Sequence, residues 1–447
     1  MSALARFYKL KGYDMSGYDR MPSDLTAELL QEGIPVHYKD DPDRLPPDSG
    51  ETLVIYTPAV PDRNRELRMA RESGYAVIKR ADALELATRG GGRIAVSGTH
   101  GKTTTTTLVS HILIQSGIGC TAFLDGISRN YGSNFLEVPG NPRLTTPPFI
   151  FEADEYDRSF LKVPPDLAVI SSVETDHLGT YTGHADIVAA FQAFARTVSG
   201  TLVVRKDVPV TREDTDAKVL TYHLSDPAAD FHANRIRPVG KGRFLFDLHY
   251  PGGVLRDIRT GIPGMMNVEN VVAAAAVAIC RGVSLKTVRS AIGSFQGVKR
   301  RLEVLVDSPS VACVDDYAHH PTELKSALAA IRDIFPGRHV TAVFQPHLFS
   351  RTKALAKEFR QALGGADRVI LLDIYPARED PEPGVSSELI LRETPCQDKV
   401  LIRKDDLLEH LAKEHLDVLA TFGAGDIGGI VESLLDAIME KYGIINK

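Results

Sequence analysis

Tryptophan is absent from the 447 residues of this chain, and there are only four cysteines. Cys120, Cys280, Cys313 and Cys396 lie far apart and form no C-x-x-C pair, so we predict neither a disulfide framework nor a cysteine zinc site. This sparse usage is typical of a reducing compartment. Long apolar runs are also lacking, because the longest, from Val271 to Cys280, is shorter than the roughly 20 residues that span a bilayer. We therefore expect a cytoplasmic protein without a membrane span.

An excess of positive charge is missing as well. Lys and Arg number 52 against 58 Asp and Glu, which gives a net charge of −6. A mildly acidic chain is a poor candidate for coating nucleic acid, so we expect no nucleic-acid partner. Hydrophobic residues make up 43% and charged residues 25%, which allows sizeable cores and excludes wholesale disorder. At roughly 150 residues per domain, the length predicts three domains.

Buried strands alternate with helical segments along the whole chain, which is typical of α/β domains with parallel sheets. The glycine run at 90–92 and Gly297 mark two breaks in this pattern. We therefore predict three domains, over residues 1–90, 91–297 and 298–447.

The first domain begins with a helix over residues 3–11, which carries Leu4 and Phe7 on one face. Short strands are predicted at 14–18 and 52–56. A domain of this kind usually begins with a strand and a glycine-rich turn that approaches a nucleotide. We therefore expect a domain truncated at its first strand, with Leu4 and Phe7 incompletely covered and with fewer backbone donors for a nucleotide.

The other predicted elements come from apolar runs and helical spacing. Middle-domain strands are expected at 93–97, 148–152, 167–173 and 201–206, with an antiparallel patch within 219–259 and an Ala-rich helix at 267–281. Last-domain strands are expected at 311–315, 339–344, 368–374 and 417–422, with helices at 321–334, 352–363 and 427–441.

The strongest motif, G-T-H-G-K-T-T at 98–104, lies between a strand and a helix. Its backbone N–H groups and the helix N-terminus would bind phosphate oxygens. Lys102 would neutralise the β- and γ-phosphates, and the Thr103 hydroxyl would reach Mg²⁺. The full Walker pattern is not present, since Val96 replaces its leading glycine. The motif predicts a nucleotide site formed by Gly98, Thr99, His100, Gly101, Lys102, Thr103 and Thr104.

Acidic residues follow two neighbouring buried strands, at the edge where a parallel sheet presents ligand groups. Glu152 ends the first of these strands, and the E-T-D-H run that contains His177 follows the second. We predict that Glu152 and His177 share a metal or phosphate site. Three further carboxylates fit a solvated acidic loop better: Asp154, Glu155 and Asp157.

In the last domain, Pro321 suits the first position of a helix. His319 and His320 would then lie at a helix N-terminus, which favours an anionic ligand. Asp315 and Asp316 end the preceding strand, and one of them could serve as a loop cap.

His347 and Arg351 follow another strand of the last domain. The guanidinium fork of Arg351 could clamp a carboxylate or phosphate, or Arg351 could be a surface arginine at a helix start.

Gly423, Gly425 and Gly428 match the G-x-G-x-x-G pattern of dinucleotide sites. No strand and acidic residue follow about 20 residues later, so we interpret the motif as a tight turn near a substrate.

In combination, these motifs resemble the Mur ligases of peptidoglycan synthesis. The matching stretches keep one order over nearly the whole chain: GTHGKTTT (98–105), EADEYDRSFL (152–161), ETDHLGTY (174–181), VKRRLE (298–303), DDYAHHP (315–321) and FQPH with SRT (344–352). Two departures are local: Met266 precedes Asn267 where members often have His, and Leu348 replaces a frequent Arg.

The resemblance implies an α/β chain with a Rossmann-like N-terminal domain for a UDP substrate, a central P-loop ATPase domain with a mostly parallel sheet, and a Rossmann-like C-terminal domain. The implied reaction uses ATP and Mg²⁺ to join L-alanine to the carboxylate of UDP-N-acetylmuramate through an acyl phosphate. We expect small-molecule partners and a monomer or homodimer.

The resemblance also implies residue roles. The catalytic residues would be Lys102, Glu152, His177 and Arg351. The metal ligands would be Thr103, Glu152 and His177. Nucleotide contacts from the last domain's side would be Asn270, Arg301 and Asp316. The substrate residues would be Ser128, Arg129 and Asn130 in a loop over 125–134, together with His319, His347 and Arg351.

Three alternatives stay open. The chain could be the related ligase that returns murein tripeptide to UDP-N-acetylmuramate, which a substrate panel would reveal. It could be a P-loop regulatory NTPase, which would turn over ATP without an added amino acid. It could also be an impaired product of a shortened gene.

Overall fold

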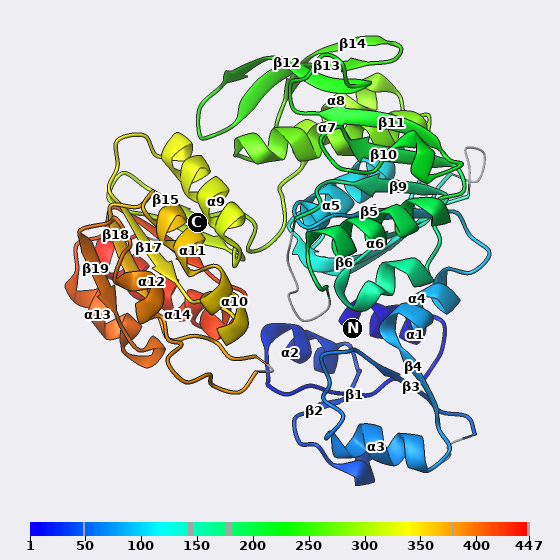
Figure 1. Cartoon of the computed structure of the whole chain (residues 1–447), viewed down its shortest axis with the longest axis horizontal. Helices are drawn as coiled ribbons and strands as arrows, with labels where there is room; N and C mark the ends of the chain where they lie inside the picture. The colour runs from blue at the N-terminus through cyan, green and yellow to red at the C-terminus, as the bar shows by residue number, and fades with distance from the viewer. Residues whose placement is uncertain (48–49, 142–145, 175–180, 378, 445–447) are drawn as a thin grey trace. The chain divides into compact units, whose positions relative to one another are not determined.

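The computed structural model describes residues 1–47, 50–141, 146–174, 181–377 and 379–444. They form two compact units (Figure 1). The first unit comprises Met1–His232 and Val272–Ala291, and the second comprises Ala233–Val271 and Ile292–Lys447. None of the helices built from the described residues combines the length and the apolar character needed to cross a membrane.

The main sheet of the first unit is mostly parallel and follows the order β11-β10-β9-β5-β8-β6-β7, and β12, whose first two residues belong to this unit, pairs parallel with β11. Among its described residues, β6 and β7 are the one antiparallel pair. The strands are β5 (Arg93–Ser97), β6 (Cys120–Ser128), β7 (Ser133–Val138), β8 (Phe149–Glu152), β9 (Leu167–Ile170), β10 (Thr201–Arg205), β11 (Lys218–His223) and β12 (Phe231–Pro238). The predicted strands at 93–97, 148–152, 167–173 and 201–206 are confirmed, although the third ends three residues early.

Helices cover both faces of this sheet. Ala95 of β5 joins a core with Phe191 and Phe194 of α6 (His184–Thr197). Its neighbours Ile94 and Val96 point to the opposite face, as alternation along a strand requires, and α5 (Lys102–Gln115) contacts β5, β6 and β8 there. Because β5 leads directly into α5 and its neighbours β8 and β9 run parallel to it, the carboxyl ends of these strands lie at the edge of the sheet where α5 begins.

Residues 1–90 contain two separate parallel pairs of short strands, β1 with β2 and β3 with β4. The predicted strand at 14–18 is reduced to two residues, whereas the one at 52–56 is confirmed within one residue. Bounds of the elements in this region are α1 (Ser2–Leu10), β1 (Gly17–Tyr18), α2 (Asp24–Gln31), β2 (Val36–His37), η1 (Pro42–Arg44), β3 (Leu53–Tyr56), α3 (Arg65–Glu72), β4 (Ala76–Lys79) and α4 (Arg80–Thr88).

The expectation that α1 has an incompletely covered face is wrong. Leu4 is 4% exposed and Phe7 is 5% exposed. The Phe7 ring packs edge-on against Phe123 of β6 and Phe135 of β7, with ring centroids 5.4 and 6.3 Å away. The sequence did not predict the β6–β7 hairpin, and this hairpin covers the apolar face of α1. Helix α1 also lies beside α4 (Figure 1).

The second unit contains a six-stranded sheet in the order β15-β16-β20-β17-β18-β19, parallel except for β15. Its strands are β15 (Glu303–Asp307), β16 (Ala312–Asp316), β17 (Val340–Phe344), β18 (Arg368–Leu371), β19 (Asp398–Leu401) and β20 (Val418–Phe422). All four predicted strands of this region are present, and the predicted helix 321–334 is α9 (Pro321–Ile334). The predicted antiparallel patch is partly wrong: β13 (Phe244–Tyr250) and β14 (Gly253–Arg259) pair antiparallel, but β11 and β12 are parallel.

Two predicted helices of the last region are each divided in two. The one at 352–363 is α10 (Phe349–Ala354) and α11 (Ala356–Leu363), and the one at 427–441 is η5 (Asp426–Ile430) followed by α14 (Val431–Tyr442). The remaining elements are η2 (Tyr156–Lys162), η3 (Arg212–Asp214), α7 (Met265–Cys280), α8 (Leu285–Ser294), α12 (Glu388–Leu391), η4 (Lys404–Asp406) and α13 (Leu407–Lys413).

Candidate nucleotide and substrate site

The turn between β5 and α5 has the backbone shape of a phosphate cradle. Gly98 and Gly101 have φ angles of +127° and +81°, which side-chain-bearing residues rarely adopt. A Cβ atom on Gly98 would lie 2.2 Å from Ser171 Oγ and 2.7 Å from the Ser172 nitrogen. The backbone nitrogen of Thr99 also donates to the carbonyl oxygen of Ser172 at 3.1 Å. The turn is therefore pressed against the end of β9, and only glycine fits at position 98.

Lys102, the first residue of α5, is held at the mouth of this turn. Its ammonium group donates to the carbonyl oxygen of Gly98 at 2.6 Å and to Glu155 Oε2 at 3.0 Å. Burial opposes the charge of Lys102, but the carboxylates of Glu155 and Asp154 outweigh that effect and raise its pKa. Lys102 therefore stays positively charged at any physiological pH.

Glu155 does not belong to a solvated acidic loop. Its side chain is 0% exposed, and its carboxylate pairs with Lys102. Asp157 fits the loop interpretation better, because its side chain is partly exposed and forms an ion pair with Lys79 at 2.6 Å. The acidic run after β8 therefore has both a buried and an exposed half.

Glu152 ends β8 with both carboxylate oxygens directed by the protein. Oε2 accepts the Thr103 hydroxyl at 2.8 Å, and Oε1 accepts the backbone N–H of Asp125 at 2.8 Å. Because the Thr103 hydroxyl donates its hydrogen to Glu152, its lone pairs are directed elsewhere. A hydroxyl and a carboxylate at this spacing form an oxygen donor set that fits Mg²⁺.

The third predicted metal ligand, His177, lies outside the described residues. The residue before that segment, Glu174, is described: its backbone nitrogen donates to Thr99 Oγ1 at 2.9 Å, and its carboxylate lies 3.3 Å from His100 Nε2. The strand end that leads to His177 is therefore tied to the phosphate-binding turn.

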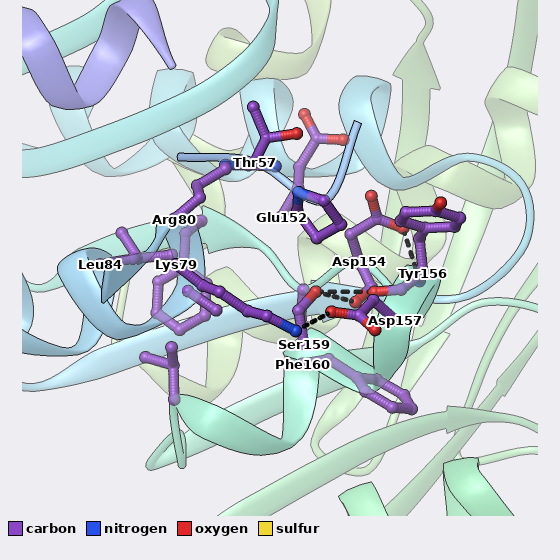
Figure 2. A pocket seen from close by; sticks show the side chains of 15 residues that line it. Thr57, Lys79, Arg80, Leu84, Glu152, Asp154, Tyr156, Asp157, Ser159 and Phe160 are labelled. Atoms are coloured by element: carbon purple, nitrogen blue, oxygen red, sulfur yellow. Dashed lines mark hydrogen bonds and ion pairs between the residues drawn. The ribbon is translucent and has the colours of Figure 1, made fainter. Parts of the chain in front are cut away.

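A pocket of about 100 Å³ opens beside Glu152 (Figure 2). Its walls come from the end of β3, the start of α4, the end of β8 and η2. Figure 2 shows Lys79 extending toward Asp157 across this pocket. The next residue, Arg80, forms an ion pair with Asp125 at 2.9 Å. Sequence analysis missed both cations, whose only signal was their place between a strand and a helix.

The predicted substrate loop over 125–134 is the β6–β7 hairpin. Its turn is closed by the backbone nitrogen of Gly132, which donates to the carbonyl oxygen of Ser128 at 2.8 Å. Ser128 is fully buried, whereas Arg129 is exposed and Asn130 is half-buried. Their assignment to substrate stays a prediction.

Asp316 in the second unit acts as a loop cap. Its carboxylate accepts the backbone N–H groups of Leu302 at 2.5 Å and Ala318 at 2.7 Å. Burial raises the pKa of Asp316 to about 6, although Arg301 and these two hydrogen bonds oppose the shift. Of the two carboxylates that end β16, Asp316 is thus the cap, and Asp315 pairs with Arg300 at 2.8 Å.

The structure brings together the predicted histidines and arginine of the second unit. His320 is the N-cap residue of α9, which begins at Pro321 as predicted. The rings of His319 and His347 lie 5.9 Å apart, and an Arg351 guanidinium nitrogen lies 3.3 Å from His347 Nδ1. Arg351 is 5% exposed, so the interpretation as a surface arginine is wrong.

Two further predicted nucleotide contacts lie on the second unit's own elements. Asn270 donates to Asn267 Oδ1 at 3.0 Å, one turn earlier in α7. The guanidinium of Arg301 lies over the ring of Tyr317, 5.1 Å from its centroid. Their role toward a nucleotide stays a prediction.

Three stretches of the chain match known sequence families: residues 1–90 match "Mur ligase family, catalytic domain", residues 96–278 match "Mur ligase middle domain", and residues 300–425 match "Mur ligase, glutamate ligase domain". A UDP-N-acetylmuramate–L-alanine ligase of Porphyromonas gingivalis is 43% identical over 96% of this chain and 95% of its own length. One from Phocaeicola vulgatus is 40% identical over 99% of this chain and 96% of its own length.

Solved structures agree with these matches. The crystal structure of a UDP-N-acetylmuramate–alanine ligase from Thermotoga maritima has a TM-score of 0.83 and 25% identity, covering 98% of this chain and 96% of that one. A murein peptide ligase from Psychrobacter arcticus shares the fold with a TM-score of 0.74 at 21% identity, covering 100% and 97% of the two chains. The three-domain α/β architecture is common to these matches, and the chain belongs to the Mur ligase family.

Proposed function

We propose that this chain is an ATP-dependent ligase that joins L-alanine to the carboxylate of UDP-N-acetylmuramate in peptidoglycan precursor synthesis. The observation that carries the proposal is the pairing of Lys102 with Glu155 and of Thr103 with Glu152 on one phosphate-binding turn. This arrangement occurs in a chain that is 43% identical, over nearly its full length, to a ligase of that name.

The reaction begins when a carboxylate oxygen of UDP-N-acetylmuramate attacks the γ-phosphorus of ATP and ADP leaves. A free carboxylate is a poor electrophile, whereas the acyl phosphate formed in this step has phosphate as a leaving group. The amine of L-alanine then attacks the acyl carbon, and phosphate departs. Positioning and charge neutralisation carry most of the phosphoryl transfer.

Lys102 and the N–H groups of the 98–103 turn neutralise and orient the phosphates in this proposal. Lys102, whose pKa is raised by Glu155 and Asp154 despite its burial, lies at the N-terminus of a 14-residue helix, which also favours anions. An entering phosphate competes with Glu155 for the ammonium group, so Glu155 holds Lys102 in place until the nucleotide binds.

Thr103 and Glu152, with His177, would hold Mg²⁺. The bound cation would neutralise phosphate charge and favour the in-line geometry of the transfer. In the second unit, His319, His347 and Arg351 would contact the muramate carboxylate or L-alanine, and Asn270, Arg301 and Asp316 would contact the nucleotide. The guanidinium of Arg351 can only donate, so His347 Nδ1 is the acceptor and a neutral ring carries its proton on Nε2.

We further propose that domains over residues 1–90, 91–297 and 298–447 supply the UDP-substrate site, the ATP site and the closing part of the active site. The catalytic steps would then depend on groups from all three segments.

Phosphate release tests the function directly. With ATP and Mg²⁺, release should require both UDP-N-acetylmuramate and an amino acid, and L-alanine should be the best amino acid in a panel. Preference for murein tripeptide over L-alanine would identify the recycling ligase instead. Equal ATP turnover without any amino acid would identify a regulatory NTPase.

A further inference from the structure

A short chain of contacts connects the first segment of the protein to the carboxylate at the centre of the ATP site. Arg80 is the first residue of α4, and its guanidinium forms an ion pair with Asp125 at 2.9 Å. The backbone nitrogen of Asp125 in turn donates to Glu152 Oε1 at 2.8 Å. Arg80 is therefore linked to Glu152 through Asp125, in addition to the direct electrostatic interaction between the two side chains.

Asp125 occupies a place where the sheet no longer fixes the backbone. The parallel pairing of β6 with β8 ends at Phe123 opposite Phe151, and β6 pairs irregularly with β7 between Phe123 and Ser128. Past that point the N–H of Asp125 donates to a side chain rather than to a neighbouring strand. The position of this N–H thus depends on what holds residue 125.

Glu152 has little freedom once both contacts are made. Its side chain is 4% exposed, and its two oxygens accept hydrogens from two different elements, the Asp125 backbone of β6 and the Thr103 hydroxyl of α5. The N–H of Asp125 therefore helps to fix the rotation of the carboxylate about its last torsion, which is otherwise broad for a glutamate. This rotation also sets the direction of the oxygen that faces Thr103.

We infer that Arg80 is a positioning residue for the metal-binding carboxylate of Glu152, acting through Asp125. This inference rests on the proposed function, because it assumes that Glu152 and Thr103 hold Mg²⁺ beside the nucleotide. Removing a group that hydrogen-bonds to a metal ligand and orients it lowers metal affinity by about ten- to a hundredfold.

If the ion pair had a purely structural role, breaking it would lower the unfolding temperature and leave the Mg²⁺ dependence unchanged. The side chains of Arg80 and Asp125 are 29% and 39% exposed, and ion pairs that water can reach contribute little to folding stability. Breaking the pair should therefore leave thermal unfolding nearly unchanged. A defect confined to the Mg²⁺ dependence would separate positioning from stability.

Arg89 provides a matched control at the other end of the same helix. It follows the last residue of α4 and pairs with Glu85 at 2.7 Å, a distance similar to that of the Arg80 pair. Within the described part of the chain, the side-chain hydrogen bonds and ion pairs of Arg89 and Glu85 involve each other and Arg93, and none reaches β6 or Glu152. Arg89→Gln therefore removes the same kind of charge from the same helix without touching the proposed chain of contacts.

The experiment measures ADP binding by calorimetry over a series of Mg²⁺ concentrations, alongside thermal unfolding. Arg80→Gln and Asp125→Ala should each raise the Mg²⁺ concentration for half-maximal binding by about tenfold. The double variant should show no larger increase than Arg80→Gln alone, because both substitutions break one contact and only Arg80→Gln also removes a charge that acts on Glu152. Arg80→Lys should recover part of the effect, and Arg89→Gln should match the unmodified chain.

Two other results would overturn the inference. One is an unchanged Mg²⁺ dependence in folded Arg80→Gln and Asp125→Ala, and the other is an equal shift in Arg89→Gln. If one variant unfolds, the other still tests the same contact. A failure of the proposed function would give a different result: ADP binding by the unmodified chain would show no dependence on Mg²⁺.

Discussion

Two glycine-rich turns in this chain follow buried parallel strands, yet they differ in which group can occupy the space beside the glycines. The first, residues 98–103, joins β5 to α5, and the second, residues 423–428, joins β20 to η5. Each begins with a glycine at positive φ, +127° at Gly98 and +145° at Gly423. By sequence pattern alone, both turns are candidates for binding phosphate.

In the first turn, the surrounding side chains prepare a place for an anion. Lys102 and Thr103 lie at the start of a long helix, and each is oriented by a buried carboxylate: Glu155, just beyond β8, and Glu152, the last residue of β8. The helix N-terminus adds partial positive charge in the same direction. The glycines here let the backbone curve closely around a ligand.

In the second turn, the protein's own side chains occupy the corresponding space. A Cβ atom on Gly425 would lie 2.3 Å from Gln345 Oε1, which already accepts the N–H of Ile427 at 3.0 Å. The amide nitrogen of Gln345 donates to Asp426, which places a carboxylate where a phosphate would need positive charge. This confirms the tight turn and argues against a dinucleotide site. A glycine pattern indicates that some group lies close to the backbone. Whether that group is a ligand or a side chain of the protein decides whether the turn is a binding site.

The largest expected effect concerns the cation of the first turn. Lys102→Ala should lower the rate of phosphate release by about 10³-fold, because a charge that neutralises the transferring phosphoryl group is lost. The substitution should also lower the unfolding temperature, since it leaves the fully buried Glu155 without its ion-pair partner. Enzyme assays and thermal unfolding measure the two effects separately.

A double variant separates these effects. Lys102→Ala with Glu155→Gln also removes the buried carboxylate charge, so it should recover part of the lost unfolding temperature without recovering activity. Near-normal turnover by either folded variant would contradict the assignment of the first turn to ATP.

The second prediction tests the two turns with the same substitution. Gly98→Ala places a methyl group 2.7 Å from the Ser172 backbone nitrogen, so it should distort the cradle and weaken ATP binding by roughly a hundredfold, about 3 kcal/mol. Gly425→Ala meets Gln345 and Tyr375 instead, so it should cost about 1–3 kcal/mol of stability and leave ATP affinity nearly unchanged. Equal losses of ATP affinity in the two variants would remove the distinction between the turns.

The sequence was sufficient for the parallel strands and the first turn because both depend on local pattern. Short, mostly apolar runs rich in β-branched residues, such as 93–97 and 340–344, are typical of buried strands, and the glycine and lysine spacing of the first turn is set by backbone geometry. The hairpin of β6 and β7 was missed because it lies at the sheet edge, where the pattern is mixed. The cover of Leu4 and Phe7 was therefore missed too.

Some candidate-site residues were misjudged for a related reason. Glu155 and Asp157 stand two positions apart in one acidic run, yet one is fully buried and the other is exposed. Only their partners, Lys102 and Lys79, distinguish them, and those partners lie 53 and 78 residues away along the chain. A single sequence records residue types but not such long-range pairings.

A third prediction compares carboxylates near the two turns. Glu152→Gln keeps the size of the side chain but removes its charge, so activity should need roughly tenfold more Mg²⁺ and reach a lower maximum. Asp426→Asn at the second turn removes a charge of the same kind that pairs with Lys404, and it should leave the Mg²⁺ titration unchanged. An unaltered Mg²⁺ titration for Glu152→Gln would show that Glu152 is not a metal ligand and only ends a strand.

The smallest effect concerns Asp316, whose carbonyl oxygen accepts the N–H of Gly423 at 3.3 Å in the second turn. Its pKa is about 6 in the folded chain against an ordinary value of 3.8, so the folded state keeps a proton that the unfolded state has released between these values. This contribution to stability is fully present below pH 3.8 and is lost as the pH rises through about 6. The gap corresponds to at most about 3 kcal/mol.

Asp316→Asn removes the titrating group and should therefore flatten this part of the pH dependence. Urea unfolding followed by circular dichroism between pH 4 and 7 would measure the difference between the variant and the unmodified chain, in which all other titrating groups cancel. The side chain keeps only one carbonyl oxygen to accept from Leu302 and Ala318, so a uniform loss of stability at every pH is also expected. Parallel pH profiles for the two chains would show that Asp316 is ionised in the folded protein throughout this range, and that the second turn rests on a charged cap.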